Sequence, residues 1–180
     1  MPQPPRARPM AASLGALAAL LLLAGCDQPD AFPPACPSLA RAKEFAEAIR
    51  FAGSGRDVTD MVLSARIAEV PAQCKRENSR AVRATLRVGV DITRGPAAAG
   101  RSAELGYFVA VTEGDRVLEE QDYTIRGTFP PNVDKVSVLG QEISLIFPVT
   151  SDKPASAYKI YVAFRLTPAE LDYNRRRGLR

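Results

Sequence analysis

The stretch Ala81-Val-Arg-Ala-Thr-Leu-Arg-Val-Gly-Val-Asp-Ile92 decides the fold class of this chain. From Val82 to Ile92 every second residue is apolar, and arginine, threonine, glycine and aspartate occupy the positions between. A period of two residues is typical of a strand with one face buried and one face in water. We therefore expect one half-buried strand over residues 82–92, which Gly95-Pro96 ends.

Shorter runs of the same kind lie along the rest of the chain, with turn signals between them. Glu113-Gly114-Asp115 is one such signal and is expected to join two strands in a hairpin. No helical crossover separates the runs, which favours antiparallel over parallel pairing. About seven short strands therefore predict a mainly β fold, a single antiparallel β-sandwich of immunoglobulin or fibronectin type. Besides 82–92, the expected strands are residues 63–67, 105–112, 116–125, 133–138, 143–149 and 158–166.

A short N-terminal helix is expected within residues 37–51. Apolar side chains recur there every three or four positions, with lysine and arginine between them. Ser38 suits the start of such a helix, and Gly53-Ser54-Gly55 suits its end. The apolar positions are Ala42, Phe45, Ala46 and Ile49.

A short C-terminal helix is expected from Pro168 to about Arg176. In Thr167-Pro168-Ala169-Glu170, threonine suits the N-cap, proline the first helical position and glutamate the capping box. Four arginines lie in the last six residues, where the negative end of the helix dipole stabilises them without any partner. The alternative is that this cluster contacts anionic lipid headgroups. The cluster consists of Arg175, Arg176, Arg177 and Arg180.

The first 25 residues have the three parts of a secretory signal. Arg6 and Arg8 give a positive start, residues 10–23 are almost all apolar, and small residues precede Cys26. Leu23-Ala24-Gly25-Cys26 resembles the lipobox of bacterial lipoproteins. The alternative, an uncleaved membrane span, needs about 20 apolar residues, whereas this run has about 14. We therefore predict a signal peptide over 1–25 and a lipid anchor on Cys26, which is otherwise an ordinary thiol.

Residues 26–35 are expected to form a tether between this anchor and a domain over 36–180. Pro29, Pro33 and Pro34 favour an extended, semi-rigid chain of about 3.1 Å per residue, so the tether spans about 30 Å at most. The predicted location is therefore the cell envelope, close to a membrane and facing the periplasm. Asp27 biases sorting weakly toward the inner membrane, and the outer membrane remains open.

Removal of residues 1–25 changes the charge of the chain. Two arginines leave with them, so 22 basic and 20 acidic residues remain and the net charge falls from +4 to +2. The pI of about 9.1 therefore reflects the signal and the arginine tail more than the domain. This balance gives no indication of nucleic-acid binding.

Cys36 and Cys74 are the cysteines that remain if Cys26 carries lipid. An exported protein meets an oxidising compartment, where two thiols are most often joined. The alternatives are two free thiols or a metal site, although the chain has no histidine to serve as a ligand. We expect a disulfide, and neither a metal nor another cofactor.

Few groups in the sequence suit catalysis. Without histidine, the usual serine, cysteine and zinc hydrolase sites cannot be assembled. Asp57 and Asp60 could hold a calcium ion or form a paired-carboxylate site. The simpler interpretation is that they bond local backbone amides and turn the chain into the next strand. A second acidic group, Glu119, Glu120 and Asp122, is expected to face water or to protect a sheet edge.

Several motifs are distributed over the mature chain: Cys36-Pro37, Gly55-Arg-Asp-Val-Thr-Asp60, a strand ending before Cys74, Arg94-Gly-Pro-Ala97, Tyr107-Phe-Val-Ala110 and Leu166-Thr-Pro-Ala-Glu-Leu-Asp-Tyr-Asn-Arg175. Together they resemble a group of proteobacterial envelope lipoproteins without an assigned activity. The resemblance extends from Cys26 to Arg175. It implies one domain and a Cys36–Cys74 pair, and it adds no catalytic residue.

The functional prediction is a lipid-anchored, non-enzymatic interaction or assembly module of the cell envelope. Its partners would be membrane lipid, through acylated Cys26, and an envelope protein. Binding would use sheet edges or loops such as residues 94–102. The alternative is a periplasmic ligand-binding protein, or a carboxylate-dependent enzyme, that uses the region of Asp57 and Asp60.

Overall fold

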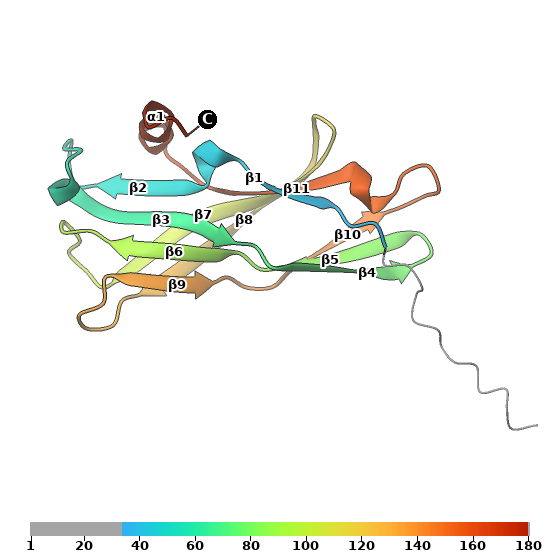
Figure 1. Cartoon of the computed structure of the whole chain (residues 1–180), viewed down its shortest axis with the longest axis horizontal. Coiled ribbons are helices and arrows are strands. Elements are labelled where there is room, and N and C mark those ends of the chain that lie inside the picture. Colours follow the sequence, from blue (N-terminus) through green and yellow to red (C-terminus); the bar gives the residue numbers. More distant parts are fainter. Residues whose placement is uncertain (1–33, 180) are drawn as a thin grey trace, which may run out of the picture. The chain divides into compact units, whose positions relative to one another are not determined.

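The computed structural model describes residues 34–179, which form a mainly β structure (Figure 1). The predicted signal peptide, Cys26 and the tether up to residue 33 lie outside the described residues. Within the described part, no helix is long and apolar enough to cross a membrane. The strands are β1 (Ser38–Arg41), β2 (Glu47–Phe51), β3 (Met61–Glu69), β4 (Ala72–Asn78), β5 (Ala81–Leu86), β6 (Gly89–Arg94), β7 (Ser102–Glu113), β8 (Arg116–Thr128), β9 (Lys135–Leu139), β10 (Ile143–Pro148) and β11 (Tyr158–Phe164). The helices are η1 (Lys43–Phe45), η2 (Val58–Asp60), η3 (Ala155–Ala157) and α1 (Pro168–Arg176).

The strands form three sheets, with the orders β1-β11-β7-β8, β2-β3-β6-β9 and β10-β5-β4. The pairing is antiparallel throughout the described residues except between β1 and β11, which run parallel. The sheets β2-β3-β6-β9 and β10-β5-β4 follow one another, because β3 leads into β4 and β5 into β6 (Figure 1). The mainly β, antiparallel prediction is confirmed, whereas the predicted number of strands was too low.

The strand predicted over residues 82–92 is divided into β5 and β6 at Arg87 and Val88. The alternation continues through the break, since Leu86, Val88 and Val90 are all buried. At the break the Arg87 amide donates to the carbonyl of Pro71, and the Arg87 side chain donates to the carbonyl of Gly140. The chain therefore passes from one sheet to the next without turning its apolar face away from the core.

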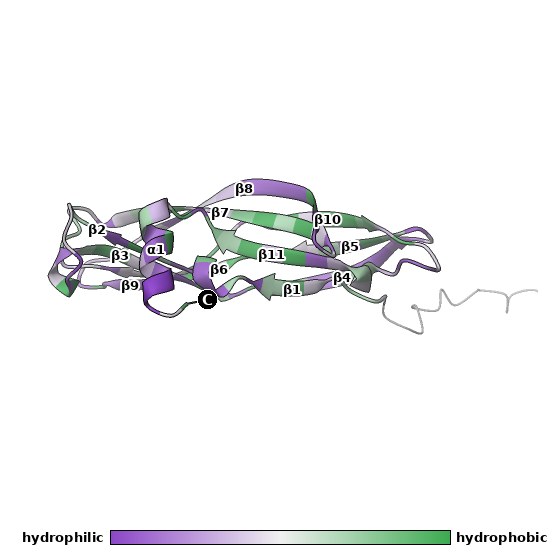
Figure 2. Cartoon of the chain, turned by 90° about the horizontal axis from the view of Figure 1, so that it is seen from above, coloured by the Kyte–Doolittle hydropathy of each residue, from purple (hydrophilic) through white to green (hydrophobic). Residues whose placement is uncertain are grey.

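One apolar core joins the three sheets. Its largest fully buried side chains include Tyr107 of β7, Phe147 of β10 and Phe164 of β11. β7 and β11 are hydrophobic along much of their length, whereas the neighbouring edge strand β8 is largely hydrophilic (Figure 2). The predicted hairpin between β7 and β8 is present, and the acidic side chains of β8 are exposed as expected. These acidic residues are Glu119, Glu120 and Asp122.

The helix predicted within residues 37–51 is wrong, because this segment forms β1, the single-turn η1 and β2. Its backbone groups pair with strands instead: β1 with β11, and β2 with β3. The helix-like spacing arises because β2 is covered on both faces. Ala48 belongs to the central core, and its neighbour Ile49 lies on the opposite face beneath α1. A strand that is buried on both faces can show apolar residues at the spacing of a helix, and here the pairing with other strands decides the structure.

The predicted C-terminal helix is confirmed as α1. The Glu170 amide donates to the Thr167 hydroxyl at 3.3 Å, and the Thr167 amide donates to the Glu170 carboxylate at 2.6 Å. This reciprocal capping box, with Pro168 at the start, fixes where the helix begins.

A disulfide joins Cys36 and Cys74, with 6.1 Å between their Cα atoms. Cys36 precedes β1 of one sheet, and Cys74 lies in β4 of another. The bond therefore fastens two sheets to each other along one side of the domain. The two alternatives, free thiols and a metal site at these cysteines, are wrong.

Candidate functional site

The helix α1 is held on the outer face of β2 by a buried asparagine and by ion pairs. Asn174 is fully buried, and its amide nitrogen donates to the carbonyls of Glu44 and Glu47 at 2.8 and 2.7 Å. Arg175 and Arg177 pair with the carboxylates of the same two residues at 2.8 and 3.1 Å. The expectation that the arginine cluster has no partner is therefore wrong for these two arginines.

Arg176 and Arg180 are the other two members of the arginine cluster. Arg176 is exposed on α1, and Arg180 lies outside the described residues. The cluster is thus divided: half of its arginines attach the helix to the domain.

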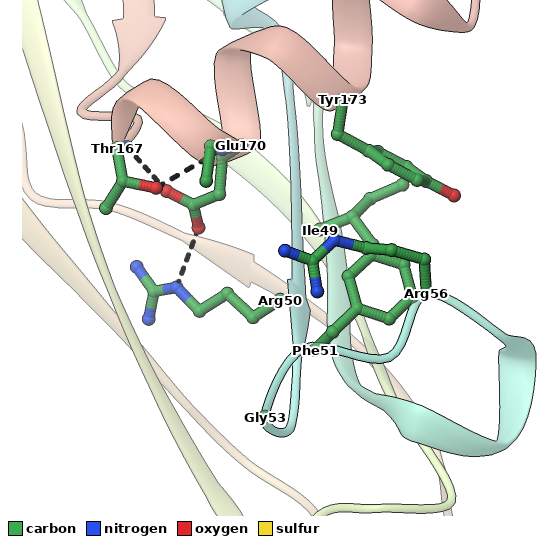
Figure 3. A pocket seen from close by; sticks show the side chains of 9 residues that line it. Ile49, Arg50, Phe51, Gly53, Arg56, Thr167, Glu170 and Tyr173 are labelled. Atoms are coloured by element: carbon green, nitrogen blue, oxygen red, sulfur yellow. Dashed lines mark hydrogen bonds and ion pairs between the residues drawn. The ribbon is translucent and has the colours of Figure 1, made fainter.

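A groove of about 310 Å³ opens between α1, β2 and the loop that follows β2 (Figure 3). Phe51 and Tyr173 meet edge to face at 5.1 Å, and the Arg56 guanidinium lies over the Phe51 ring at 5.4 Å. Arg50 donates to the Glu170 carboxylate and to the carbonyl of Glu104, both at 3.0 Å. We call this the α1 groove.

The α1 groove suits binding better than catalysis. Both carboxylate oxygens of Glu170 are engaged, one by Arg50 and the other by the Thr167 amide. Thr167 itself caps the helix. What remains accessible is an aromatic floor with the Arg56 cation beside it, which suits a carboxylate or an aromatic side chain of a partner.

Asp60 lies in the exposed turn η2, and Asp57 directly precedes it. The Asp60 carboxylate accepts a hydrogen bond from the Asp57 amide at 3.2 Å, and the Asp60 amide donates to the Asp57 carbonyl at 3.0 Å. The carboxylate also lies so close to Gly55 that a Cβ at residue 55 would be 2.0 Å from its Oδ2 atom. These contacts are those of a local turn. Across residues 34–179, no group of three or more metal-ligating side chains is brought together.

A second groove, of about 260 Å³, lies between the edge strands β8 and β10. Its lining is mostly apolar, and the side chains of Leu118 and Ile146 at its border are 42% and 55% exposed. Within the described chain, β8 pairs only with β7, and β10 only with β5. We call this the β8–β10 groove. Its apolar lining residues are Val111, Leu118, Leu145, Ile146, Phe147, Pro148 and Tyr158.

Ion pairs border the β8–β10 groove at one end. Glu113 accepts from Lys153 at 2.6 Å and from Arg116 at 2.9 Å. The Lys153 hydrogen bond, with that of Arg116, lowers the pKa of Glu113, and the bond to Glu113 raises the pKa of Lys153. The Tyr158 hydroxyl donates to the carbonyl of Pro148 at 2.8 Å. The polar groups at this end therefore satisfy one another.

Sequence reasoning found the buried face of β10 but missed the groove. The alternation predicts Ile143, Leu145 and Phe147 on one face, and all three are buried. Ile146 stands on the other face, where a polar residue is expected, and this exception is the signal that could have revealed the groove.

The loop proposed for binding, within residues 94–102, is braced by Arg94. The Arg94 side chain donates to the carbonyls of Gly100 and Ala98, at 2.9 and 3.2 Å, and to Asp134 at 3.2 Å. Because the Arg94 side chain bonds two carbonyls of this loop, the loop presents a fixed surface.

Comparison of the chain with protein-family models, with curated proteins and with solved structures finds no match.

Proposed function

We propose that this protein is a lipid-anchored lipoprotein of the cell envelope that binds a partner protein without catalysing a reaction. In this proposal the signal peptide is removed, Cys26 carries the lipid, and the three sheets act together as one β-sandwich facing the periplasm. The shared core and the short tether support this arrangement.

The β8–β10 groove is the observation that carries the proposal. Exposed sheet edges normally carry charged residues that prevent pairing with other chains. β8 follows this pattern, with Glu119, Glu120 and Asp122 exposed, but β10 presents Ile146 beside an apolar groove. A short edge with an adjoining apolar groove suits an extended peptide that adds a strand and inserts its alternate side chains.

The partner is therefore expected to supply an extended segment with apolar residues at every second position. Its backbone would pair along β10, and its side chains would enter the space lined by Leu118, Leu145 and Phe147. The contacts of Asp57 and Asp60 are those of a turn and give the carboxylate alternative no support. That alternative stays a prediction.

Site-specific photocrosslinking in intact cells tests the partner. A photoreactive residue is placed at Ile146 or Leu118 on the groove, and at Val58 as the control, since Val58 is exposed and lies on η2. We expect the same adduct from both groove positions and none from Val58. The substitution Ile146→Asp should abolish the adduct formed at Leu118, whereas Val58→Asp should leave it unchanged.

The adduct must then behave as a strand-addition complex. Hydrogen exchange of the purified complex should show slower exchange of the β10 amides than in the free protein. Adducts of equal yield from Val58, or unchanged exchange in β10, would contradict the groove as the binding site.

Mass spectrometry of the mature protein tests the anchor separately. We expect an N-terminal peptide that begins at Cys26 and carries acyl chains. An unmodified Cys26 would refute the anchor.

A further inference from the structure

The lining of the α1 groove carries more positive than negative charge. Arg50 and Arg56 line it together with a single acid, Glu170, which leaves a net charge of +1. One carboxylate oxygen of Glu170 accepts from Arg50 and the other from the Thr167 amide. Glu170 therefore serves as the counter-charge of Arg50, and the charge of Arg56 is left over.

The Arg56 guanidinium has no acidic partner among the described residues. It donates through Nη1 to the carbonyl of Gly55 at 2.5 Å, and it lies over the Phe51 ring. Asp57 and Asp60 follow in the sequence but do not line the groove, and the Asp60 carboxylate accepts from the Asp57 amide. The Nε and Nη2 atoms of Arg56 make no hydrogen bond within residues 34–179. Two such neighbouring donors suit a carboxylate, which can accept from both.

Aromatic side chains lie directly beside this cation. The rings of Phe51 and Tyr173 are half-buried and meet edge to face, with Ile49 on the same outer face of β2. Figure 3 shows the Arg56 side chain extended along the Phe51 ring and next to Tyr173. A third ring can pack edge to face or offset against such a pair. The groove thus offers a place for a ring and a place for a carboxylate only a few ångströms apart.

The size of the groove limits what can bring a ring and a carboxylate together. Its volume of about 310 Å³ is at the lower end of the roughly 300 to 1,000 Å³ that ligand sites occupy, which suits one aromatic residue. In an extended peptide, consecutive side chains point in opposite directions. An acidic residue beside an aromatic one would therefore direct its carboxylate away from the groove. The last residue of a chain carries its ring and a carboxylate on the same Cα atom.

We propose that the α1 groove binds the carboxyl-terminal aromatic residue of a peptide. The terminal carboxylate pairs with Arg56, and the ring packs against Phe51 and Tyr173. This site shares no lining residue with the β8–β10 groove, and it depends neither on that groove nor on the lipid anchor. Val58, the control position for the β8–β10 groove, does not line it either.

Nuclear magnetic resonance titration of the mature chain with Cys26→Ser tests the site. This variant keeps the Cys36–Cys74 bond and carries no lipid. The probe is N-acetylphenylalanine, which has the ring and the carboxylate but no ammonium group. We expect saturable shifts of the amide signals of β2 and α1.

Three related compounds separate the contributions of the groups. N-acetylphenylalaninamide lacks the carboxylate and should bind about fivefold more weakly, the loss expected for an exposed ion pair. N-acetylalanine lacks the ring and should bind at least about tenfold more weakly. Free phenylalanine should also bind more weakly than its acetylated form, because its ammonium group is repelled by Arg56.

Two peptides distinguish a chain end from an acidic side chain. Acetyl-Gly-Gly-Phe has a free terminal carboxylate and should bind about as tightly as N-acetylphenylalanine. Acetyl-Asp-Phe-amide has the same charge and the same ring, but its carboxylate is on the neighbouring side chain. It should bind about as weakly as N-acetylphenylalaninamide.

Arg56→Gln removes the proposed partner of the carboxylate. It should weaken binding of N-acetylphenylalanine about fivefold and leave binding of the amide unchanged. The matched control is Arg176→Gln, which removes the same charge from an exposed position outside the groove. The control should leave the affinity for both compounds unchanged, and circular dichroism should show both variants folded.

Equal affinities for N-acetylphenylalanine and its amide would overturn the carboxylate site. Equal loss in the Arg56 and Arg176 variants would overturn it too, because net charge alone would then account for binding. Tighter binding of free phenylalanine or of acetyl-Asp-Phe-amide than of acetyl-Gly-Gly-Phe would overturn the chain end as the ligand. Photocrosslinking at Ile146 and Leu118 decides the β8–β10 groove independently of these results.

Discussion

The two sides of the β domain are covered and cross-linked to different degrees. On the side of β1 and β4, the Cys36–Cys74 disulfide joins two sheets, and beyond β1 and η1 the helix α1 covers β2 with Asn174 fully buried. On the side of β8 and β10, the described chain supplies neither a disulfide nor an α-helix, and a groove opens beside the exposed Ile146. The chain closes one side itself and leaves the other accessible.

This difference shows which edges the sequence protects. Buried hydrogen bonds such as those of Asn174 are costly to break, whereas partly exposed ion pairs such as that of Glu113 with Lys153 contribute less stability. The closed side should therefore carry more of the stability, and the open side should tolerate change and favour binding. Four predictions test this division.

Removal of the disulfide is expected to have the largest effect. Replacing Cys36 and Cys74 with serine frees the unfolded chain from a loop across 38 positions and lowers the free energy of unfolding by about 4 kcal/mol. Urea denaturation followed by circular dichroism measures the change. The Cys26→Ser variant is the control and should match the parent; a double variant as stable as the parent would contradict the role assigned to this bond.

Asn174→Ala is expected to lower the free energy of unfolding by about 3 kcal/mol, because two carbonyls beneath α1 lose the side-chain donor that both share. Hydrogen exchange should also show α1 opening while the β core stays protected. Arg176→Ala, an exposed position on the same helix, serves as the control and should change stability by less than about 0.5 kcal/mol. Loss of protection throughout the core would instead mean that α1 is part of the folding unit of the sheets.

The sequence predicts the closed side only in part. The capping box of Thr167 and Glu170 is local, so the beginning of α1 could be predicted from four residues. The partners of Asn174 lie 127 and 130 positions away, and no local pattern indicates them. The same limit explains the error in residues 37–51: burial of Ile49 beneath α1 depends on a helix from the other end of the chain.

The sequence also predicts the side of β8 and β10 only in part. Alternation predicts which residues of β10 face the core, because that depends on a period of two within one strand. Whether β10 lies at an edge depends on which strands pair, and those contacts join distant segments. The division of residues 82–92 has the same origin, since Arg87 bonds to Pro71 and Gly140 from two other parts of the chain.

Gly140→Ala, just before β10, is expected to lower the free energy of unfolding by about 2 kcal/mol. A Cβ at residue 140 would lie 3.0 Å from the Tyr107 hydroxyl and 3.2 Å from the Val88 carbonyl, at the point where β9 gives way to β10. Tyr107 is fully buried, and its hydroxyl has no hydrogen-bond partner in the described structure. Tyr107→Phe alone should therefore be close to neutral.

The double variant sharpens this prediction. Tyr107→Phe removes the atom nearest to the added methyl group, so part of the cost of Gly140→Ala should be recovered, and a double-mutant cycle by urea denaturation measures the coupling. Strictly additive effects would show that the Val88 carbonyl alone sets the cost.

The smallest expected effect concerns the ion pairs at the border of the β8–β10 groove. Hydrogen bonds from Lys153 and Arg116 lower the pKa of Glu113 below its usual 4.5, so these pairs favour the folded state above about pH 4.5 and are lost as the pH falls through the lowered pKa. A carboxyl titration by nuclear magnetic resonance should show the lowered pKa in the parent and a value near 4.5 in a Lys153→Met, Arg116→Met variant. Acidification should then speed amide exchange around the turn between β7 and β8 more in the parent than in that variant, which no longer has the two ion pairs to lose. Equal acceleration in the parent and the variant would mean that the ion pairs of Glu113 do not hold this border of the β8–β10 groove.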